Sequence, residues 1–300
     1  MIQRSERLQT LKQETPAMTN ALIAPPYQLS STRHGTMLAN ANDVYMGQAF
    51  LRYGECCEIE IRLLLSLLKV PGMVIEVGAN MGVHTVPMAT ELARQGRSML
   101  ALEPQPIIFQ QLCANLAING LLNVSALSYA CGKESGVVSF EVPDYRSRGN
   151  FGGTSMCARP TTPTHHETVP CIRLDDLVPT AAVGLIKIDV EGYELQVLEG
   201  SSDIIARSRP VLYVENDRVN QSPQLIQWLF DHDYQLWWHL PPLFNPENFF
   251  EVKENIYPKI LSCNMLCIPK LSNLSIEGLA RVADPFFHPF APQPPTHLQK

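Results

Sequence analysis

The sequence has no apolar run of membrane-spanning length, and its first residues, Met1–Arg7, lack the apolar core of a signal peptide. Positive charge is also scarce, since 23 Lys and Arg face 29 Asp and Glu for a formal net charge of −6. No basic run is interleaved with aromatic residues, which argues against nucleic-acid binding through a basic surface. We therefore expect a cytoplasmic protein with no membrane span and no nucleic-acid partner.

The cysteines form no metal-binding pattern. None of the eight belongs to a C-x-x-C pair, and most lie in apolar surroundings. Cys263 and Cys267 have three residues between them, but no nearby histidine completes a zinc site. We therefore expect reduced cysteines in the core and no protein ligand for a metal among them.

At 300 residues and 45% hydrophobic content, the chain can bury one large core with small additions. Residues 1 to about 35 are polar and interrupted by prolines, and the end of the chain is proline-rich. The predicted division is a partly disordered N-terminal extension over 1–45, one domain over 46–270 and a C-terminal tail over 271–300. Hydrophobic patterning predicts helices over 55–69, 106–119 and 224–230. It also predicts strands over 123–128 and 137–142, an edge strand over 234–238 and a last strand over 264–268. The segment 136–174 contains a long loop that resembles a lid.

A glycine-bounded loop follows the first buried strand. Residues 73–77 are short and apolar, Gly78 and Gly82 allow a tight turn and close approach of a ligand, and a helix is predicted from Gly82 to about Leu92. Free N–H groups at the helix start, near His84 and Thr85, could hold a carboxylate. The loop lacks G-x-G-x-x-G, which argues against a dinucleotide cofactor and so against a nicotinamide dehydrogenase.

The next apolar run ends at Glu103-Pro104, where an acid can accept both hydroxyls of a ribose. S-adenosylmethionine has a ribose, a carboxylate and a sulfonium cation, and Glu76 can offset that cation. Ala130, after the predicted third strand, either touches the adenine or belongs to an ordinary turn. The loop and its acids therefore predict S-adenosylmethionine as the cofactor.

A second strand, over residues 183–188, carries charge. Lys187 and Asp189 share one face because side chains alternate along a strand. A central parallel strand is normally apolar, so these two need partners or a ligand. If this strand lies beside the first, Lys187 can pair with Glu76, and Asp189 stands at the carboxyl end, where open α/β sheets bind ligands.

The strand after Pro210 ends in Glu215-Asn216-Asp217, which should reach the same rim as Asp189. Clustered carboxylates suit either general-base catalysis or a hard divalent cation. Mg²⁺ held by this group is therefore an alternative way to lower the pKa of a hydroxyl, and Asp217 can equally be a solvated strand end.

The chain resembles the FkbM-type S-adenosylmethionine-dependent methyltransferases over about residues 55–270. The matching residues are Glu76–Gly82, Glu103-Pro104, Asn115, Asn119-Gly120, Leu174–Leu177, Ile186–Gly192, Glu194, Val197–Gly200 and Pro210–Glu215. The string Lys187-Ile-Asp-Val-Glu-Gly192 makes the match specific. Two departures, the insert Asn150–Ser155 and the polar string Glu215–Asp217, lie where acceptor specificity would be set.

The resemblance implies a Rossmann-like α/β fold of class I methyltransferases, with seven mostly parallel strands and helices on both faces. It also implies methyl transfer to a hydroxyl of a glycan or secondary metabolite. By this similarity Glu76, Gly78, Asn80, Gly82 and Glu103 line the cofactor site, and Asp189 and Glu191 sit where cofactor and acceptor meet.

Methyl transfer requires alignment of the acceptor oxygen and removal of its proton. The candidate catalytic side chains are Asp189, Glu191, Lys187 and Glu215, with Asp189 or Glu191 as the base, assisted by His34, His84 or His239. Two competing interpretations remain. The presence of both Glu103 and the Asp189 cluster argues against a non-catalytic binding or scaffold protein. The acidic balance and the absence of an Asn-Pro-Pro-aromatic motif argue against a nucleic-acid methyltransferase.

Overall fold

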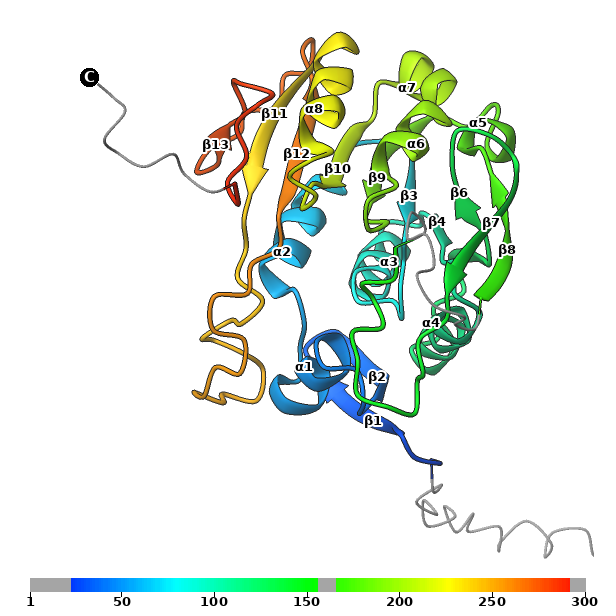
Figure 1. Cartoon of the computed structure of the whole chain (residues 1–300), viewed down its shortest axis with the longest axis vertical. Helices are drawn as coiled ribbons and strands as arrows, with labels where there is room; N and C mark the ends of the chain where they lie inside the picture. The colour runs from blue at the N-terminus through cyan, green and yellow to red at the C-terminus, as the bar shows by residue number, and fades with distance from the viewer. Residues whose placement is uncertain (1–22, 156–165, 292–300) are drawn as a thin grey trace, which may run out of the picture.

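The computed structural model describes residues 23–155 and 166–291 and is built around one central sheet (Figure 1). Its eight strands lie in the order β13-β11-β12-β10-β9-β3-β4-β5. The five strands from β10 to β5 run parallel, and β12 is antiparallel to both of its neighbours. The strands are β3 (Met73–Val77), β4 (Met99–Leu102), β5 (Val124–Leu127), β9 (Val183–Ile188), β10 (Val211–Glu215), β11 (Tyr234–His239), β12 (Asn264–Pro269) and β13 (Ala280–Arg281).

This sheet confirms the predicted α/β fold with a mostly parallel sheet. The seven predicted strands are present, and β13 adds a two-residue strand beside Trp237 and Trp238. The prediction of an edge strand over 234–238 was wrong, because β13 covers that edge. The strand over 264–268 lies inside the sheet, between β10 and β11.

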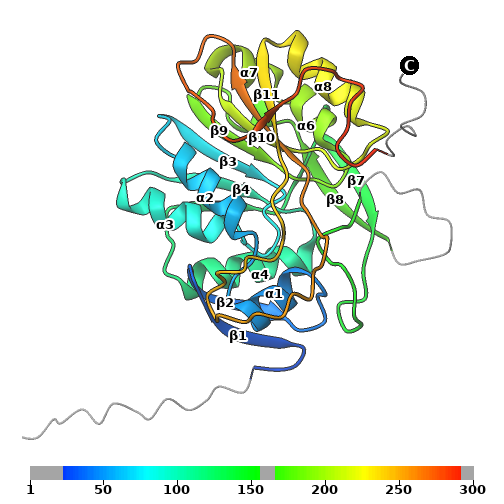
Figure 2. The same ribbon diagram turned by 90° about the vertical axis from the view of Figure 1, so that its left-hand side faces the viewer.

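Helices cover both faces of the sheet (Figures 1 and 2). Apolar side chains of α2 and α3 pack on one face, and those of α5 to α8 pack on the other. Each helix predicted from periodicity is found, with both ends within three residues of the expected positions. The helices are α1 (Met46–Tyr53), α2 (Glu58–Leu67), α3 (Thr85–Arg94), α4 (Pro106–Ile118), α5 (Leu174–Leu177), α6 (Glu194–Glu199), α7 (Ser202–Ser208) and α8 (Ser222–Asp231).

A second, three-stranded sheet stands beside the main one (Figure 1). It has the order β6-β8-β7, from β6 (Ala130–Cys131), β8 (His166–Ile172) and β7 (Gly136–Glu141). The strand predicted over 137–142 is therefore confirmed. The predicted loop within 136–174 consists partly of this sheet, and its residues 156–165 lie outside the described part of the chain.

The described part of the predicted N-terminal extension contains a hairpin of β1 (Tyr27–Thr32) and β2 (Gly35–Asn40). Two asparagines, Asn115 in α4 and Asn119 directly after it, connect the hairpin to the domain. The Asn115 Oδ1 atom accepts the N–H of Leu38 at 2.6 Å, and the Asn119 Oδ1 atom accepts the N–H of Thr36 at 2.9 Å. These contacts explain the two asparagines noted in the sequence, because each satisfies backbone groups of a hairpin far away in the chain.

The described C-terminal residues run back across the sheet edge (Figure 2). The buried ring of His288 donates from Nε2 to the carbonyl oxygen of Asn216 at 2.8 Å. This bond brings the segment 285–291 of the predicted tail close to the carboxyl end of β10. Among residues 23–155 and 166–291, no helix is long and apolar enough to cross a bilayer.

Candidate active site

Three strand-to-helix connections meet at the carboxyl end of the sheet. The N–H of Asp189 donates to the carbonyl of Val77 at 3.0 Å, and the N–H of Gly78 donates to that of Leu102 at 2.9 Å. Gly78 has φ +83°, and a Cβ at this position would collide with the carbonyl oxygen of Asp189. Glycine is required here because the loops after β3 and β9 touch through their backbones.

A cavity opens between these loops. Six residues predicted to bind the cofactor line it, namely Gly78, Asn80, His84, Glu103, Pro104 and Asp189. The rest of its wall comes from Met46, Ala79, Val83, Gln105, Phe140, Gly152, Thr154, Val190 and Glu191. Gly152 and Thr154 belong to the insert noted in the sequence, so the insert forms part of this cavity.

Four other predicted cofactor residues lie outside the lining. Thr85 donates from Oγ1 to Glu76 Oε2 at 2.6 Å, and both side chains are fully buried beneath the loop. Gly82 has φ +96° and packs against Leu112 of α4. Ala130 is buried in the small sheet, paired with Cys171, and does not reach the cavity. None of the four is part of the cavity wall.

Glu103 is held by the backbone at the end of β4. One carboxylate oxygen accepts the N–H of Asn80 at 2.9 Å, and the other accepts the N–H of Gln105 at 2.8 Å. Burial raises the pKa of Glu103 to about 7, although the two N–H donors lower it. Each oxygen keeps acceptor capacity after these bonds, so the carboxylate can receive two further donors.

A second, larger cavity adjoins the first. The two share Met46, His84, Gly152, Asp189 and Glu191 in their walls. The second cavity is also lined by Tyr45, Cys57, Glu60, Asn150, Gly153, Glu215, Asp217, Arg218, Leu243, Ile260, Leu261, Ser262, Cys263, Asn264 and Phe290. Two connected cavities with acids at the junction suit a reaction between two bound molecules.

Lys187 lies under this junction and is 1% exposed. Its Nζ atom is 2.9 Å from Asp189 Oδ2 and 3.6 Å from Glu76 Oε1, which confirms the predicted pairing with Glu76. Burial lowers the pKa of Lys187, but Asp189 and Glu76 outweigh it and hold that pKa above its usual range. Lys187 therefore acts as a buried ammonium that orients Asp189, and it lines neither cavity.

The polar residues at the end of β10 and directly after it face in different directions. Glu215 lines the second cavity, as does Asp217, whereas Asn216 points away and donates to Ser222 Oγ at 2.9 Å. Arg218 forms ion pairs with both Glu191 and Asp217. Burial and the neighbouring Asp189 raise the pKa of Glu191 to about 8, although Arg218 lowers it. Burial and the same Asp189 raise the pKa of Glu215 well above its usual range.

Of the three histidines considered as assisting bases, His84 alone is at the cavities. His34 bonds Glu58 Oε2 at 2.7 Å, and His239 bonds the hydroxyl of Tyr213 at 2.7 Å. Sequence reasoning also missed several lining residues, among them Cys57, Glu60, Gln105 and Arg218. For Glu60 the sequence did hold a signal, because a carboxylate stands within the apolar stretch that forms α2. In the structure this side chain is buried, at 3% exposed.

Comparison with known proteins identifies one family. Residues 76–236, more than half of the chain, match the model of the methyltransferase FkbM domain. The hexuronic acid methyltransferase AglP of Haloferax volcanii is 29% identical over 148 residues, which make up 48% of this chain and 56% of that protein. The chain therefore spans little more than half the length of that relative.

Two further matches cover more of the chain. The 31-O-demethyl-FK506 methyltransferase FkbM of Streptomyces tacrolimicus is 28% identical over 231 residues, covering 67% of this chain and 83% of that protein. A crystal structure of an FkbM methyltransferase from Methylobacillus flagellatus aligns at 17% identity and a TM-score of 0.43, over 65% of this chain and 43% of the other.

Proposed function

The chain belongs to the methyltransferase FkbM family, and from this premise we propose that it transfers a methyl group from S-adenosylmethionine to a hydroxyl oxygen. One observation carries the proposal. A cavity lined by the buried carboxylate of Glu103 shares Asp189 and Glu191 with the wall of a second cavity. The first cavity would hold the cofactor and the second the acceptor.

The residues present fit this cofactor. Glu103 keeps acceptor capacity on both oxygens for the two ribose hydroxyls. Val83 and His84 lie in the cavity wall where the chain enters α3, and their backbone N–H groups are the candidates to receive a carboxylate. Further along the first turn, Val86 and Met88 already donate to backbone carbonyls and Pro87 has no N–H. Asp189 supplies negative charge at the junction, where the sulfonium would lie.

When bound, S-adenosylmethionine supplies a methyl carbon whose bond to the positively charged sulfur breaks, with the electron pair going to sulfur. The chain's own part is to align the acceptor oxygen with that carbon and to take the hydroxyl proton. We assign the proton to Glu191, because it borders both cavities and its pKa near 8 suits a base at neutral pH. Asp189, fixed by Lys187, is the orienting carboxylate.

The acceptor class that we propose is a glycan or a hydroxylated secondary metabolite. The names of the two curated relatives refer to a hexuronic acid and to the 31-O position of FK506, so both suggest an oxygen-rich acceptor. The second cavity supports such an acceptor, because its wall combines carboxylates and Arg218 with the apolar side chains of Leu243, Ile260 and Phe290.

Calorimetric titration with S-adenosylhomocysteine tests the cofactor half of the proposal. The wild type should bind, and Glu103→Ala should lose most of the affinity, whereas Glu134→Ala, an exposed acid outside both cavities, should bind normally. Transfer of a radioactive methyl group to a panel of hydroxylated sugars and polyketides then tests the acceptor half. Binding without transfer to any hydroxyl compound would favour the non-catalytic interpretation.

A further inference from the structure

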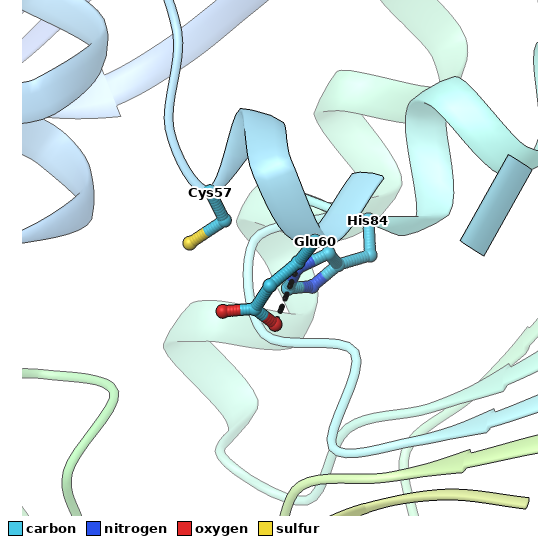
Figure 3. A group of neighbouring side chains, drawn as sticks. All are labelled: Cys57, Glu60 and His84. Atoms are coloured by element: carbon cyan, nitrogen blue, oxygen red, sulfur yellow. Dashed lines mark ion pairs between the residues drawn. The ribbon is translucent and has the colours of Figure 1, made fainter. Parts of the chain in front are cut away.

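A cysteine, a glutamate and a histidine converge beside the second cavity (Figure 3). Cys57 precedes α2, Glu60 lies in its first turn, and His84 precedes α3. One ligand atom from each side chain lies within 4.8 Å of the other two. All three residues are buried, with exposures of 8%, 3% and 4%. A thiol, a carboxylate and an imidazole are together the usual protein ligands of zinc.

The spacing between His84 and Glu60 is that of two ligands of one ion. The Nε2 atom of His84 lies 3.4 Å from Glu60 Oε2, as the dashed line in Figure 3 marks. A tetrahedral centre with zinc bond lengths of about 2.0–2.3 Å separates its ligand atoms by roughly 3.3–3.7 Å. Among the described residues, this buried Nε2 atom makes no hydrogen bond of normal geometry, and its contact is the ion pair with Glu60. A divalent ion between the two side chains would replace the imidazole proton of that pair.

The other ring nitrogen of His84 faces a second carboxylate. Its Nδ1 atom lies 3.9 Å from Glu76 Oε1, and Glu76 is completely buried. Histidines that bind metals usually direct their second nitrogen at a carboxylate, a carbonyl or a water, which fixes the ring and its tautomer. Glu76 lies on that side of the ring, at ion-pair distance but beyond hydrogen-bond distance.

The electrostatics of the region favour a cation. The carboxyl groups of Glu60, Glu76, Asp189, Glu191, Glu215 and Asp217 gather around the junction and the second cavity. Among the described side chains, Lys187, Arg218 and His84 form ion pairs with this group. A bound divalent ion would offset part of the remaining negative charge.

We propose that Cys57, Glu60 and His84 bind a divalent transition-metal ion, zinc before others, whose fourth position opens on the second cavity. A thiolate and an imidazole select a borderline metal over Mg²⁺ or Ca²⁺, which prefer oxygen ligands. Three protein ligands with an open position are the arrangement of a catalytic rather than a structural zinc site. This site departs from the expectation, drawn from cysteine spacing alone, that no cysteine binds a metal.

The use of the ion rests on the proposed methyl transfer. Its open position would take the acceptor's hydroxyl oxygen, lower the pKa of that hydroxyl and hold it at the junction. The proton still passes to Glu191, and the oxygen forms its bond to the methyl carbon as described above. The binding of metal by itself does not depend on this step.

The test is metal content and cobalt spectroscopy on the full chain. After exposure to Zn²⁺ and removal of the excess, elemental analysis should find one zinc per chain, and Co²⁺ substitution should give a thiolate-to-cobalt absorption band. Cys57→Ala should abolish the band, and His84→Gln should lower zinc affinity at least tenfold. The matched control is Cys56→Ala, because Cys56 is equally buried and its sulfur lies 3.3 Å from that of Cys57.

Each outcome supports the site or overturns it. The metal site would be overturned by any of three results. These are a wild type without stoichiometric zinc, a cobalt band that survives Cys57→Ala, and a loss of metal in Cys56→Ala alone. Circular dichroism and chemical denaturation of the same variants show that they are folded, and S-adenosylhomocysteine titration is done on the wild type. Cofactor binding without metal would refute only the metal site, whereas metal without cofactor binding would refute the proposed function and leave the site standing.

Discussion

Glu76 and Lys187 occupy directly paired positions on the neighbouring parallel strands β3 and β9, with Oε1 and Nζ 3.6 Å apart and both side chains fully buried. The pair joins the two strands whose loops build the first cavity. Lys187 also reaches Asp189 at 2.9 Å, so the pair extends to the surface of the site. A buried ion pair therefore connects the stability of the sheet with the position of a site carboxylate.

Replacing Glu76 with glutamine should destabilise the protein. The variant keeps the volume and an acceptor for Thr85, but it leaves Lys187 with Asp189 alone in a buried setting. Breaking a buried pair costs about 3–5 kcal/mol, and the remaining carboxylate should reduce the loss to about 2–4 kcal/mol. Chemical denaturation measures this loss in the free energy of unfolding. Glu91→Gln, on the surface of α3, is the control and should unfold like the wild type. An unchanged unfolding free energy for Glu76→Gln would refute the structural role of the pair.

Gly78→Ala should abolish cofactor binding. The added methyl group would meet the carbonyl oxygen of Asp189 at a positive φ, so the loops after β3 and β9 would have to separate. Gly136→Ala is the matched control, because a Cβ there meets nothing within 4 Å. Titration with S-adenosylhomocysteine should show a loss of at least a hundredfold for Gly78→Ala and none for Gly136→Ala. Equal affinities would show that the backbone contact is dispensable.

Cofactor affinity should depend on pH through Glu103. Its pKa of about 7 lies above the usual value because of burial, so the carboxyl is mostly protonated near pH 6. Ribose hydroxyls donate best to the ionised form, so binding should release a proton and tighten as pH rises. We expect a gain of up to about tenfold per pH unit below pH 7 and a plateau above about pH 8. Calorimetry in buffers of different ionisation enthalpy measures the proton release, which should vanish in Glu103→Gln. A flat profile in the wild type would contradict this assignment.

Removing Arg218 should shift the activity profile toward alkaline pH. Arg218 pairs with Glu191 and lowers its pKa, opposing burial and Asp189. In Arg218→Met the base would therefore ionise at higher pH, and the acidic limb of the rate profile should move up by about 1 pH unit. Arg94→Met, which removes an exposed arginine of α3, should leave the limb in place. An unmoved limb in Arg218→Met would mean that Glu191 is not the base.

The sequence by itself determined the sheet and the cofactor loop. The apolar strand over 73–77, the glycines around the first loop and the acid at Glu103 are local patterns, and short-range geometry fixes what they do. The pairing of Lys187 with Glu76 was also predictable, because two charges on adjacent buried strands have few other partners.

Tertiary structure alone decided which acids face the site and which residues complete it. Glu215 lines the second cavity, whereas the side chain of the next residue, Asn216, bonds Ser222. The position of β10 in the sheet decides which of the two faces the cavity. The cavity wall includes Met46 from α1 and Gly152 from the insert, which no local pattern connects to the glycine loop. Cys57 and Glu60 meet His84 because α2 and α3 pack on the same face of the sheet. Sequence spacing reports contacts within an element, whereas contacts between elements depend on how the whole chain buries its apolar surface.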